Sequence, residues 1–173
     1  MKRKLISKII ISNILFFLSL PILSAATLSV QIVQVDKIHK DVTLSSLLVE
    51  ESILDFLFNQ GFIVSNSPII TGENNSSTGF ALAMNDARSG LADYLAFVTI
   101  FYDLENSTSP EESILSNIES AQWQLIQITD NKQIASGKHI PKIKTEKDNS
   151  TEGISSFGKQ IATAINSGIS KKR

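Results

Sequence analysis

The stretch from Tyr94 to Tyr102 limits the fold of this chain more than any other part of the sequence. It reads Tyr-Leu-Ala-Phe-Val-Thr-Ile-Phe-Tyr, so nearly every side chain is apolar, β-branched or aromatic. A strand with one face in water alternates polar and apolar residues, whereas a strand buried on both faces does not. The run therefore predicts a central strand that is covered on both faces.

The chain after residue 26 opens with the pattern of a strand, a helix and a second strand. Residues 28–35 alternate and then become apolar, and a helix follows, capped by Asp41 or Thr43 and stopped by Gly61. The predicted apolar side of this helix consists of Leu44, Leu47, Leu48, Leu54, Leu57 and Phe58, and its polar side of Glu50, Glu51 and Asp55. A short strand at residues 62–65 comes next, which favours parallel pairing of the two strands.

The rest of the chain predicts four further elements around the central strand. Residues 68–78 read as a loop, and residues 80–88 read as a helix that stops at Gly90. Residues 121–125 alternate as a strand with one wet face, and the Asp130-Asn131 turn leads to a partner strand at residues 132–140. A final helix capped by Ser150 or Thr151 is predicted to bury Ile154, Phe157, Ile161, Ala164, Ile165 and Ile169. The order β-α-β-α-β-β-β-α predicts an α/β (α+β) fold with a single mixed sheet and helices packed on it.

The first 26 residues have the layout of a secretory signal peptide. Four basic residues precede an apolar stretch at residues 9–23, which ends in the small residues Ser24, Ala25 and Ala26. The apolar stretch is shorter than the ~20 residues that a spanning helix needs. We therefore expect cleavage between Ala26 and Thr27, a single domain over residues 27–173, no stable membrane span after cleavage, and a periplasmic or secreted protein.

The amino-acid composition of residues 27–173 limits the kinds of site and partner that this part of the chain can have. The chain has no cysteine, so we expect no disulfide, no reactive thiol and no lipid attached at the cleavage site. Residues 27–137 carry 4 basic and 14 acidic groups, whereas residues 138–173 carry 8 basic and 3 acidic groups. An acidic body with a basic end is a poor match for nucleic-acid binding. It fits a solvated surface, or a surface that docks a charged partner.

No motif in the sequence specifies a catalytic or metal site. Ser156 and Lys159 match the Ser-x-x-Lys nucleophile motif, but the accompanying motifs of those enzymes are absent. The only histidines, His39 and His139, have at most one acid nearby, Asp41 beside His39, whereas a zinc site needs three or four ligands. We therefore predict no enzyme activity, and no catalytic, cofactor-binding or metal-binding residues.

Trp123 is the aromatic residue with the clearest alternative roles. It lies between Gln122 and Gln124 in the alternating strand, where packing into the core is the default. If its face of the late hairpin is uncovered, Trp123 could anchor a partner instead, because tryptophan is frequent at binding hot spots. Trp123, Gln122 and Gln124 are therefore the candidate partner-binding residues.

Three stretches resemble a family of bacterial envelope domains that includes LpoB, CsgG and the N-terminal domain of TolB. They are the helix end and strand at residues 57–64, the Gly-Leu-Ala-Asp-Tyr-Leu entry to the central strand at residues 90–95, and the late hairpin at residues 123–137. The resemblance implies a non-catalytic domain that binds other envelope proteins. This chain would be a non-lipidated relative, without a propeller after the domain and without a Pro-rich tether before it.

The leading hypothesis is therefore a periplasmic or secreted adaptor or regulator of a cell-envelope assembly. It would bind an unidentified envelope protein through a sheet edge or through the exposed face of the late hairpin. One alternative is a small periplasmic hydrolase or ligand-binding protein, which would need a pocket with convergent polar groups. The other is a subunit of a surface or motility assembly.

Overall fold

The computed structural model describes residues 25–72, 76–105, 107 and 109–171, so residues 1–24 of the predicted signal peptide lie outside the described part. Within that part the chain forms one mixed sheet of six strands with three α-helices packed on it. The elements are β1 (Thr27–Val35), α2 (Leu44–Asn59), β2 (Ile63–Asn66), β3 (Ile70–Thr71), α3 (Ser76–Ser89), β4 (Tyr94–Tyr102), the 3₁₀ turn η1 (Leu115–Asn117), β5 (Ile118–Gln127), β6 (Lys132–His139) and α4 (Thr151–Ser170).

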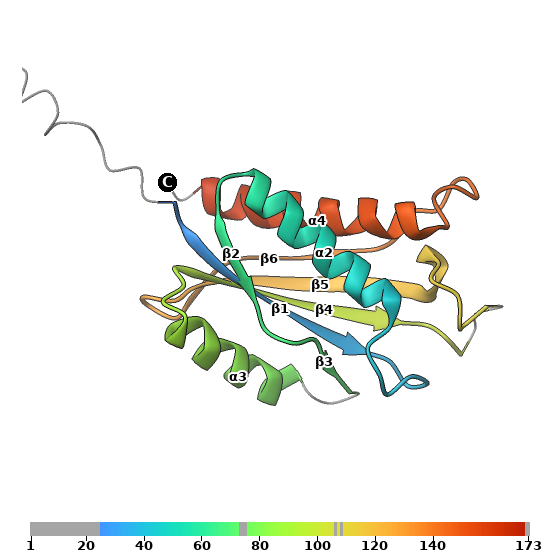
Figure 1. The fold of residues 1–173 in the computed structure, drawn as a ribbon, viewed down its shortest axis with the longest axis horizontal. Coiled ribbons are helices and arrows are strands. Elements are labelled where there is room, and N and C mark those ends of the chain that lie inside the picture. Colours follow the sequence, from blue (N-terminus) through green and yellow to red (C-terminus); the bar gives the residue numbers. More distant parts are fainter. Residues whose placement is uncertain (1–24, 73–75, 106, 108, 172–173) are drawn as a thin grey trace, which may run out of the picture.

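The sheet lies between two helical layers, as Figure 1 shows, with α2 and α4 on one face and α3 on the other. Its strand order is β2-β1-β4-β5-β6, and β3 also pairs with β1. The strand predicted to be central, β4, lies in the middle, and six consecutive residues from Leu95 to Ile100 are buried. The prediction from its apolar composition is confirmed, because the two helical layers cover both of its faces.

The topology creates a switch point at the carboxyl ends of β1 and β4. These two strands run parallel to each other, and β1 also runs parallel to β2 and β3, whereas β4, β5 and β6 pair antiparallel. The connection from β1 to β2 passes through α2 on one face, and the connection from β3 to β4 passes through α3 on the other. In open α/β sheets a crevice forms where successive connections leave on opposite faces. The fold therefore places a candidate site beyond the ends of β1 and β4.

The buried face of α2 differs from the predicted one. Leu44, Leu47 and Phe58 are exposed, whereas Val49, Ile53 and Leu57 are fully buried together with several serines. Packing against α4 explains the difference: a Cβ added at Gly158 would lie 2.9 Å from the Ser52 Cβ. Small residues let the two helices approach closely, so serines occupy the interface that the sequence pattern assigned to leucines.

Glu50 also departs from the predicted polar side of α2. It is only 9% exposed, and its Oε1 accepts a hydrogen bond of 3.1 Å from Asn66 Nδ2 on β2. A second difference concerns the predicted loop at residues 68–78, which contains β3 and the first residues of α3. A two-residue strand is too short to produce an alternating pattern, so only its pairing with β1 reveals it.

The predicted helix caps are largely confirmed. Thr43 caps α2 by accepting a hydrogen bond from Ser46 N, and Ser150 caps α4 in the same way. Gly61 takes the left-handed conformation after α2, with φ of 86°, but after α3 the residue in that conformation is Leu91 (φ 55°) instead of Gly90. The bonds from Leu91 N to Arg88 O and from Ala92 N to Ala87 O close α3 in a Schellman motif, with Leu91 in the position that usually carries glycine.

The last helix closes the main core as predicted. Ile154, Phe157, Ile161, Ile165 and Ile169 are at most 2% exposed, and Ala164 is partly buried. Full burial of each large apolar side chain contributes roughly 1.5–3 kcal/mol. None of the helices in the described part of the chain is long and apolar enough to cross a membrane.

Candidate functional site

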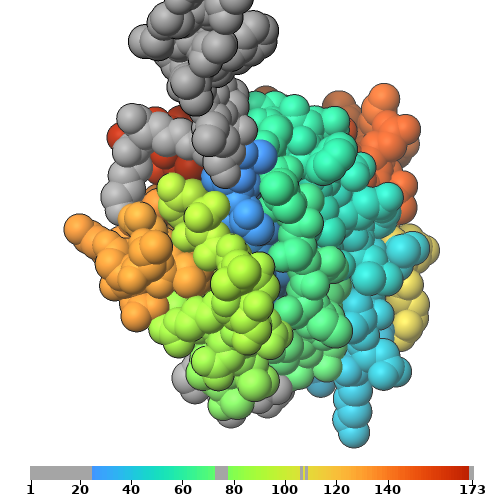
Figure 2. Space-filling model, turned by 60° about the vertical axis from the view of Figure 1, so that its left-hand side comes forward, coloured from blue at the N-terminus to red at the C-terminus, as the bar shows by residue number. Residues whose placement is uncertain are grey.

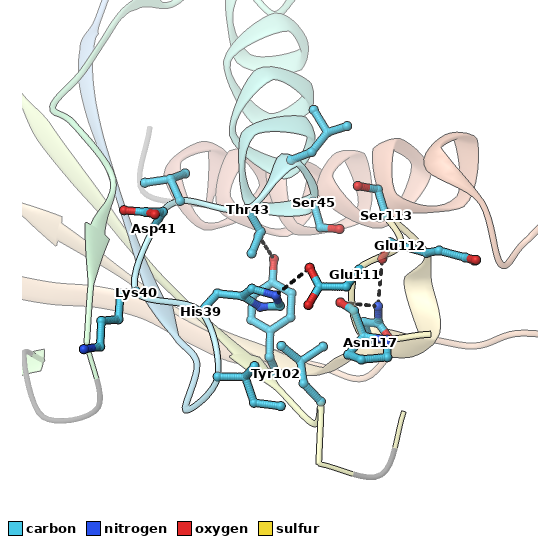
Figure 3. A pocket seen from close by; sticks show the side chains of 15 residues that line it. His39, Lys40, Asp41, Thr43, Ser45, Tyr102, Glu111, Glu112, Ser113 and Asn117 are labelled. Atoms are coloured by element: carbon cyan, nitrogen blue, oxygen red, sulfur yellow. Dashed lines mark hydrogen bonds and ion pairs between the residues drawn. The ribbon is translucent and has the colours of Figure 1, made fainter. Parts of the chain in front are cut away.

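A polar pocket of about 350 Å³ occupies the switch point at the end of the sheet. We call it the carboxyl-edge pocket; Figure 3 shows the loop after β1, the start of α2, the end of β4 and the loop before η1 meeting around it. Its lining includes Ile38, His39, Lys40, Asp41, Thr43, Ser45, Tyr102, Glu111, Glu112, Ser113 and Asn117. Segments distant in sequence therefore bring both charged and hydroxyl groups to one place.

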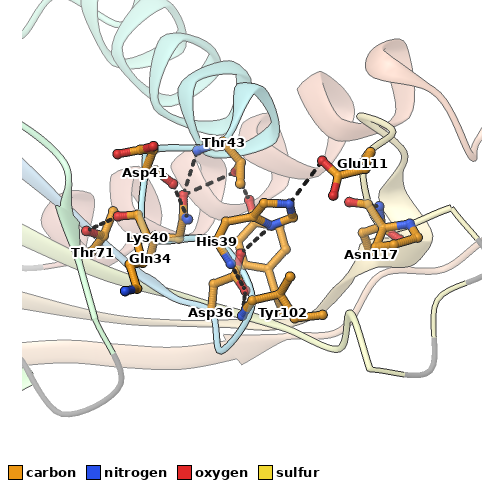
Figure 4. Close-up of polar contacts among 12 residues, drawn as sticks. Gln34, Asp36, His39, Lys40, Asp41, Thr43, Thr71, Tyr102, Glu111 and Asn117 are labelled. Carbon is orange, nitrogen blue, oxygen red and sulfur yellow. Dashed lines mark hydrogen bonds and ion pairs between the residues drawn. The ribbon is translucent and has the colours of Figure 1, made fainter.

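Thr43 and Tyr102, which line the carboxyl-edge pocket, belong to a hydrogen-bonded network centred on Gln34, which is fully buried at the end of β1. Gln34 Oε1 accepts from Thr43 N at 2.9 Å and from Ser46 Oγ at 2.9 Å, and Gln34 Nε2 donates to Asp41 O at 3.0 Å. The Tyr102 hydroxyl lies 3.0 Å from Thr43 Oγ1 and 2.8 Å from Ser46 Oγ. The network attaches the first turn of α2 to the ends of β1 and β4 (Figure 4).

Tyr102 stays protonated within this network. Burial raises the pKa of its phenol above the ordinary value of 10.0, and the charge of Asp36 acts in the same direction. Hydrogen bonds with Ser46 and Thr43 lower the pKa, but less than burial raises it. The hydroxyl therefore serves as a neutral donor and acceptor at neutral pH.

His39 links two walls of the carboxyl-edge pocket. Its Nδ1 lies 3.0 Å from Asp36 Oδ2, and its Nε2 lies 3.3 Å from Glu111 Oε2 in the loop before η1. Burial alone would lower the pKa of His39, but hydrogen bonds and charge interactions with the two carboxylates outweigh it and raise the pKa above 6.5. The acids that contact His39 are thus Asp36 and Glu111 and not Asp41, the acid nearest to it in the sequence.

Asn117 holds the loop that carries Glu111. Its side chain is buried, and Nδ2 donates to Glu112 O at 2.7 Å and to Ser109 O at 3.0 Å. Asp36 fixes the opposite loop, because its Oδ1 accepts from Ile38 N at 2.7 Å. These side chains shape the pocket from both sides. Within the described residues, no group of three or more His, Cys, Asp or Glu side chains could hold a metal ion.

A second concave region runs between the edge strand β6 and the C-terminal half of α4. This β6–α4 groove has a volume of about 600 Å³. Its lining consists of Trp123, Lys132, Gln133, Ile134, Ala135, Ser136, Ala164, Ser167, Gly168 and Lys171. Small and apolar side chains form much of the surface, and the two lysines are its charged groups.

The three candidate partner-binding residues do not share a face. Trp123 is 6% exposed and packs in the main core beneath α4, whereas Gln122 and Gln124 are exposed on the opposite face of the sheet. Trp123 nevertheless lines the β6–α4 groove, and its buried Nε1 has no hydrogen-bond partner within the described chain. The packing expected of this tryptophan is therefore present, and its binding role stays a prediction.

The remaining candidate groups are His139, Ser156 and Lys159. They line neither the carboxyl-edge pocket nor the β6–α4 groove. His139, on β6, stacks edge-to-face with Phe157 at a ring-centroid distance of 6.5 Å, and burial lowers its pKa below 6.5. Ser156 and Lys159 lie on the exposed side of α4, and no hydrogen bond joins them in the described structure. The helix packs on the sheet by its other side, which includes the buried residues Phe157 and Ile161.

Sequence reasoning did not identify Gln34, Asp36, Asn117 or Tyr102 as site residues. Gln34 and Asp36 adjoin the apolar end of β1, and Tyr102 ends the central strand. The available signal was topological: polar residues that follow two neighbouring parallel strands meet at the same edge of the sheet. Without knowledge of the strand order, that signal could not be used.

Comparisons with known proteins give weak likenesses to solved structures and a clear family match. Two of the similar structures are a PelC dodecamer from Paraburkholderia phytofirmans (16% identity, 84% of this chain and 86% of that chain, TM-score 0.47) and TolB from Acinetobacter baumannii (9%, 84% and 28%, 0.46). A third is a lipoprotein from Neisseria meningitidis (15% identity, 86% of this chain and 99% of that chain, TM-score 0.45).

At TM-scores below 0.5 these likenesses carry no argument about function, and no curated protein matches the chain. The resemblance to LpoB and CsgG stays a prediction. Residues 27–170 match the model of a family whose description reads "Uncharacterised protein". The match covers most of the chain, which therefore belongs to this family.

Proposed function

We propose that this chain is an exported, non-catalytic protein-binding domain that acts as an adaptor or regulator in a cell-envelope assembly. The observation that carries the proposal is the position of β6, an eight-residue strand at the edge of the sheet. Its outer side pairs with no strand of the described chain, and Gln122, Gln124 and Lys138 are exposed on the outer face of the β5–β6 hairpin, away from the turn end where Ile126 packs with α3. Unpaired edges of this kind are sites where partner segments add to a sheet.

The hairpin is also accessible from outside the molecule. In Figure 2 the turn between β5 and β6 projects at one margin, next to α3. Asn131 takes φ of 55° in this turn, which keeps the hairpin tight. A tight hairpin with an open edge and an open face offers a rigid surface for docking.

Export is supported by the start of β1. Thr27 is the first residue of the strand, and its backbone N lies 2.8 Å from Asp93 Oδ2. Cleavage after Ala26 would turn this amide into a charged amine already placed beside a carboxylate. The ion pair would compensate for the loss of the bond from Ile63 N to Ala26 O. Mass spectrometry of the protein from the envelope fraction should find Thr27 at its amino terminus, and an intact Met1 terminus would contradict export by this route.

Site-specific photo-crosslinking in cells tests the binding role. A photoreactive amino acid is placed at Gln124 or Lys138 on the hairpin, and at Glu51, exposed on α2, as the matched control. The proposal expects one and the same envelope protein to be trapped from both hairpin positions and not from Glu51. No crosslinked product, or the same products from all three positions, would contradict it.

A second candidate function is binding of a small polar ligand in the carboxyl-edge pocket. The observation that favours it is the convergence of His39, Tyr102 and Glu111 at the switch point. A screen of polar metabolites by thermal shift would compare the wild-type protein with Ser113→Phe, which narrows the pocket. A compound that raises the melting temperature of the wild type alone would support this function, and equal shifts in both proteins would exclude it.

A further inference from the structure

We propose that the β6–α4 groove captures an extended, acidic segment of the partner, which adds to β6 as a further strand and places apolar side chains against α4. The inference rests on the proposed protein-binding function and names the surface and the chemistry of the partner. Four features of the groove carry it: its shape, an unpartnered donor in its wall, its charge and the length of its edge strand.

The shape of the groove depends on small residues on both walls. A Cβ added at Gly168 would lie 2.9 Å from the Ala135 Cβ and 3.1 Å from Leu125 Cδ2, so α4 approaches the hairpin closely at this point. Ala164 and Ser167 extend the same wall along the helix. Short side chains leave about 600 Å³ between helix and strand, which is room for the side chains of an added segment.

The indole of Trp123 supplies a hydrogen-bond donor that nothing in the described chain satisfies. Trp123 is 6% exposed, and its Nε1 has no hydrogen-bond partner among the described residues. That edge of the ring lies against β6, because a Cβ added at Gly137 would come within 2.9 Å of Nε1. A buried donor without an acceptor costs about 1–3 kcal/mol. A carbonyl or carboxylate oxygen from a bound segment would remove that cost.

The charge of the groove selects an acidic segment. Lys132, at the start of β6, and Lys171, just after α4, both line the groove, and its lining contains no Asp or Glu. Lys138 lies further along the same strand and is exposed on the opposite face of the hairpin, with Gln122. Residues 27–137 are predominantly acidic, with 14 acidic and 4 basic groups, so Lys132 differs in charge from most of the segment that contains it. Opposite charges steer association and fix the register of the bound segment.

The length of β6 sets the length of the segment. Eight residues of edge strand accommodate a partner strand of similar length, and alternate side chains of that strand would point toward α4. The expected segment therefore places small apolar residues toward α4, and acidic residues at its other positions and at the end that lies beside Lys132 and Lys171. A capped synthetic peptide of sequence Glu-Val-Glu-Val-Glu-Val-Glu is a suitable probe, with a peptide in which lysine replaces each glutamate as its control.

Trp123 provides the measurement, because it is the only tryptophan of the chain. Titration of the purified protein with the acidic peptide should change the tryptophan fluorescence in a saturable way, and the lysine peptide should not. Ser167→Phe, which fills the groove from an exposed position, should weaken binding at least tenfold. Thr163→Phe, exposed on the same helix outside the groove, should leave the affinity unchanged. The double variant Lys132→Glu and Lys171→Glu should weaken binding at least tenfold as well.

Three results would overturn the inference. The first is no fluorescence response to the acidic peptide. The second is equal affinity in the Ser167→Phe and Thr163→Phe proteins. The third is self-association in sedimentation experiments that Ser167→Phe abolishes, which would assign the groove to a second copy of the chain. Crosslinking from Gln124 and Lys138 separates this inference from the proposed function: if the partner is still trapped in Ser167→Phe cells, the protein-binding role stands and the groove assignment fails.

Discussion

The carboxyl-edge pocket and the β5–β6 hairpin each contain one of the two histidines of the chain, but the buried polar groups of these two regions differ in their hydrogen bonding. Around His39 the buried side chains of Gln34, Asp36 and Asn117 all have hydrogen-bond partners. In the β5–β6 hairpin two buried atoms have no partner within the described chain: Nε1 of Trp123, whose side chain lines the groove, and Nδ1 of His139, which lies outside the groove lining.

The difference indicates which of the two regions has the hydrogen bonds of its buried polar groups satisfied within the chain. Most buried polar groups in folded proteins are hydrogen-bonded, and a saturated network mainly holds its own elements in place. The pocket network does this by fixing α2 to the ends of β1 and β4. A buried group without a partner in the chain is one that an ordered water or a bound ligand can satisfy. The contrast therefore favours a structural role for the pocket network and a binding role for the groove.

The largest expected effect comes from Phe157→Ala, which removes the contact of α4 with His139 in the hairpin. The ring is 2% exposed and stacks against His139. Loss of a buried aromatic side chain costs about 3–5 kcal/mol, and we expect a decrease of that size in the free energy of unfolding, measured by urea denaturation. Ser156→Ala, the exposed neighbour on α4, should change it by less than about 0.5 kcal/mol. A Phe157→Ala protein as stable as the wild type would show that α4 is docked in another way.

Gln34→Leu tests whether the pocket network is structural. The substitution keeps a buried side chain of similar length but leaves Thr43 N and Ser46 Oγ without their shared acceptor. Unsatisfied buried groups cost about 1–3 kcal/mol each, so we expect a loss of about 2–3 kcal/mol in urea denaturation. The same change at exposed Gln124 is the control and should have little effect. Equal stability of the two variants would mean that the network contributes nothing to folding.

The strands and the last helix could be predicted because their signals are local. The apolar run of β4 and the spacing of Ile154, Phe157 and Ile161 each reflect burial of one element against its neighbours. The buried face of α2 could not be predicted in this way. It is set by the close approach of Ser52 to Gly158, two residues more than a hundred positions apart.

The carboxyl-edge pocket and the β6–α4 groove could not be predicted from the sequence either, because each depends on contacts between segments that are distant in the chain. The pocket network joins Gln34, Thr43, Ser46 and Tyr102, whose types and spacing match no motif. Its assembly depends on β1 and β4 being neighbours, which no local pattern encodes. Trp123 was recognised as important, but only the packing of α4 shows that the same side chain both fills the core and lines the groove.

His139→Leu tests the second region of the comparison, the β5–β6 hairpin with its unsatisfied buried nitrogens. The substitution removes a buried nitrogen that has no partner in the described part of the chain, and it keeps an apolar side chain against Phe157. Replacing an unsatisfied polar group by an apolar one of similar size is neutral or stabilising, so the free energy of unfolding should rise by 0 to about 1 kcal/mol. His39→Leu should do the opposite, because it removes the partner of buried Asp36 Oδ2. Destabilisation by both substitutions would refute the contrast between the two regions.

The smallest effect is the pH dependence of stability, in which the two histidines should act with opposite signs. The pKa of His39 is raised in the folded protein, so its contribution is fully present below the ordinary pKa of 6.5 and is lost as the pH rises through the raised value. Burial lowers the pKa of His139, so its contribution is present above 6.5 and is lost as the pH falls through the lowered value.

Urea denaturation at a pH of about 5.5 and of about 8 should therefore show that His39→Leu is more destabilising at the lower pH. His139→Leu should be more favourable at that same pH, and the other titrating groups cancel because each variant is compared with the wild type under the same conditions. Differences of the same sign for both variants would mean that the two histidines lie in similar surroundings.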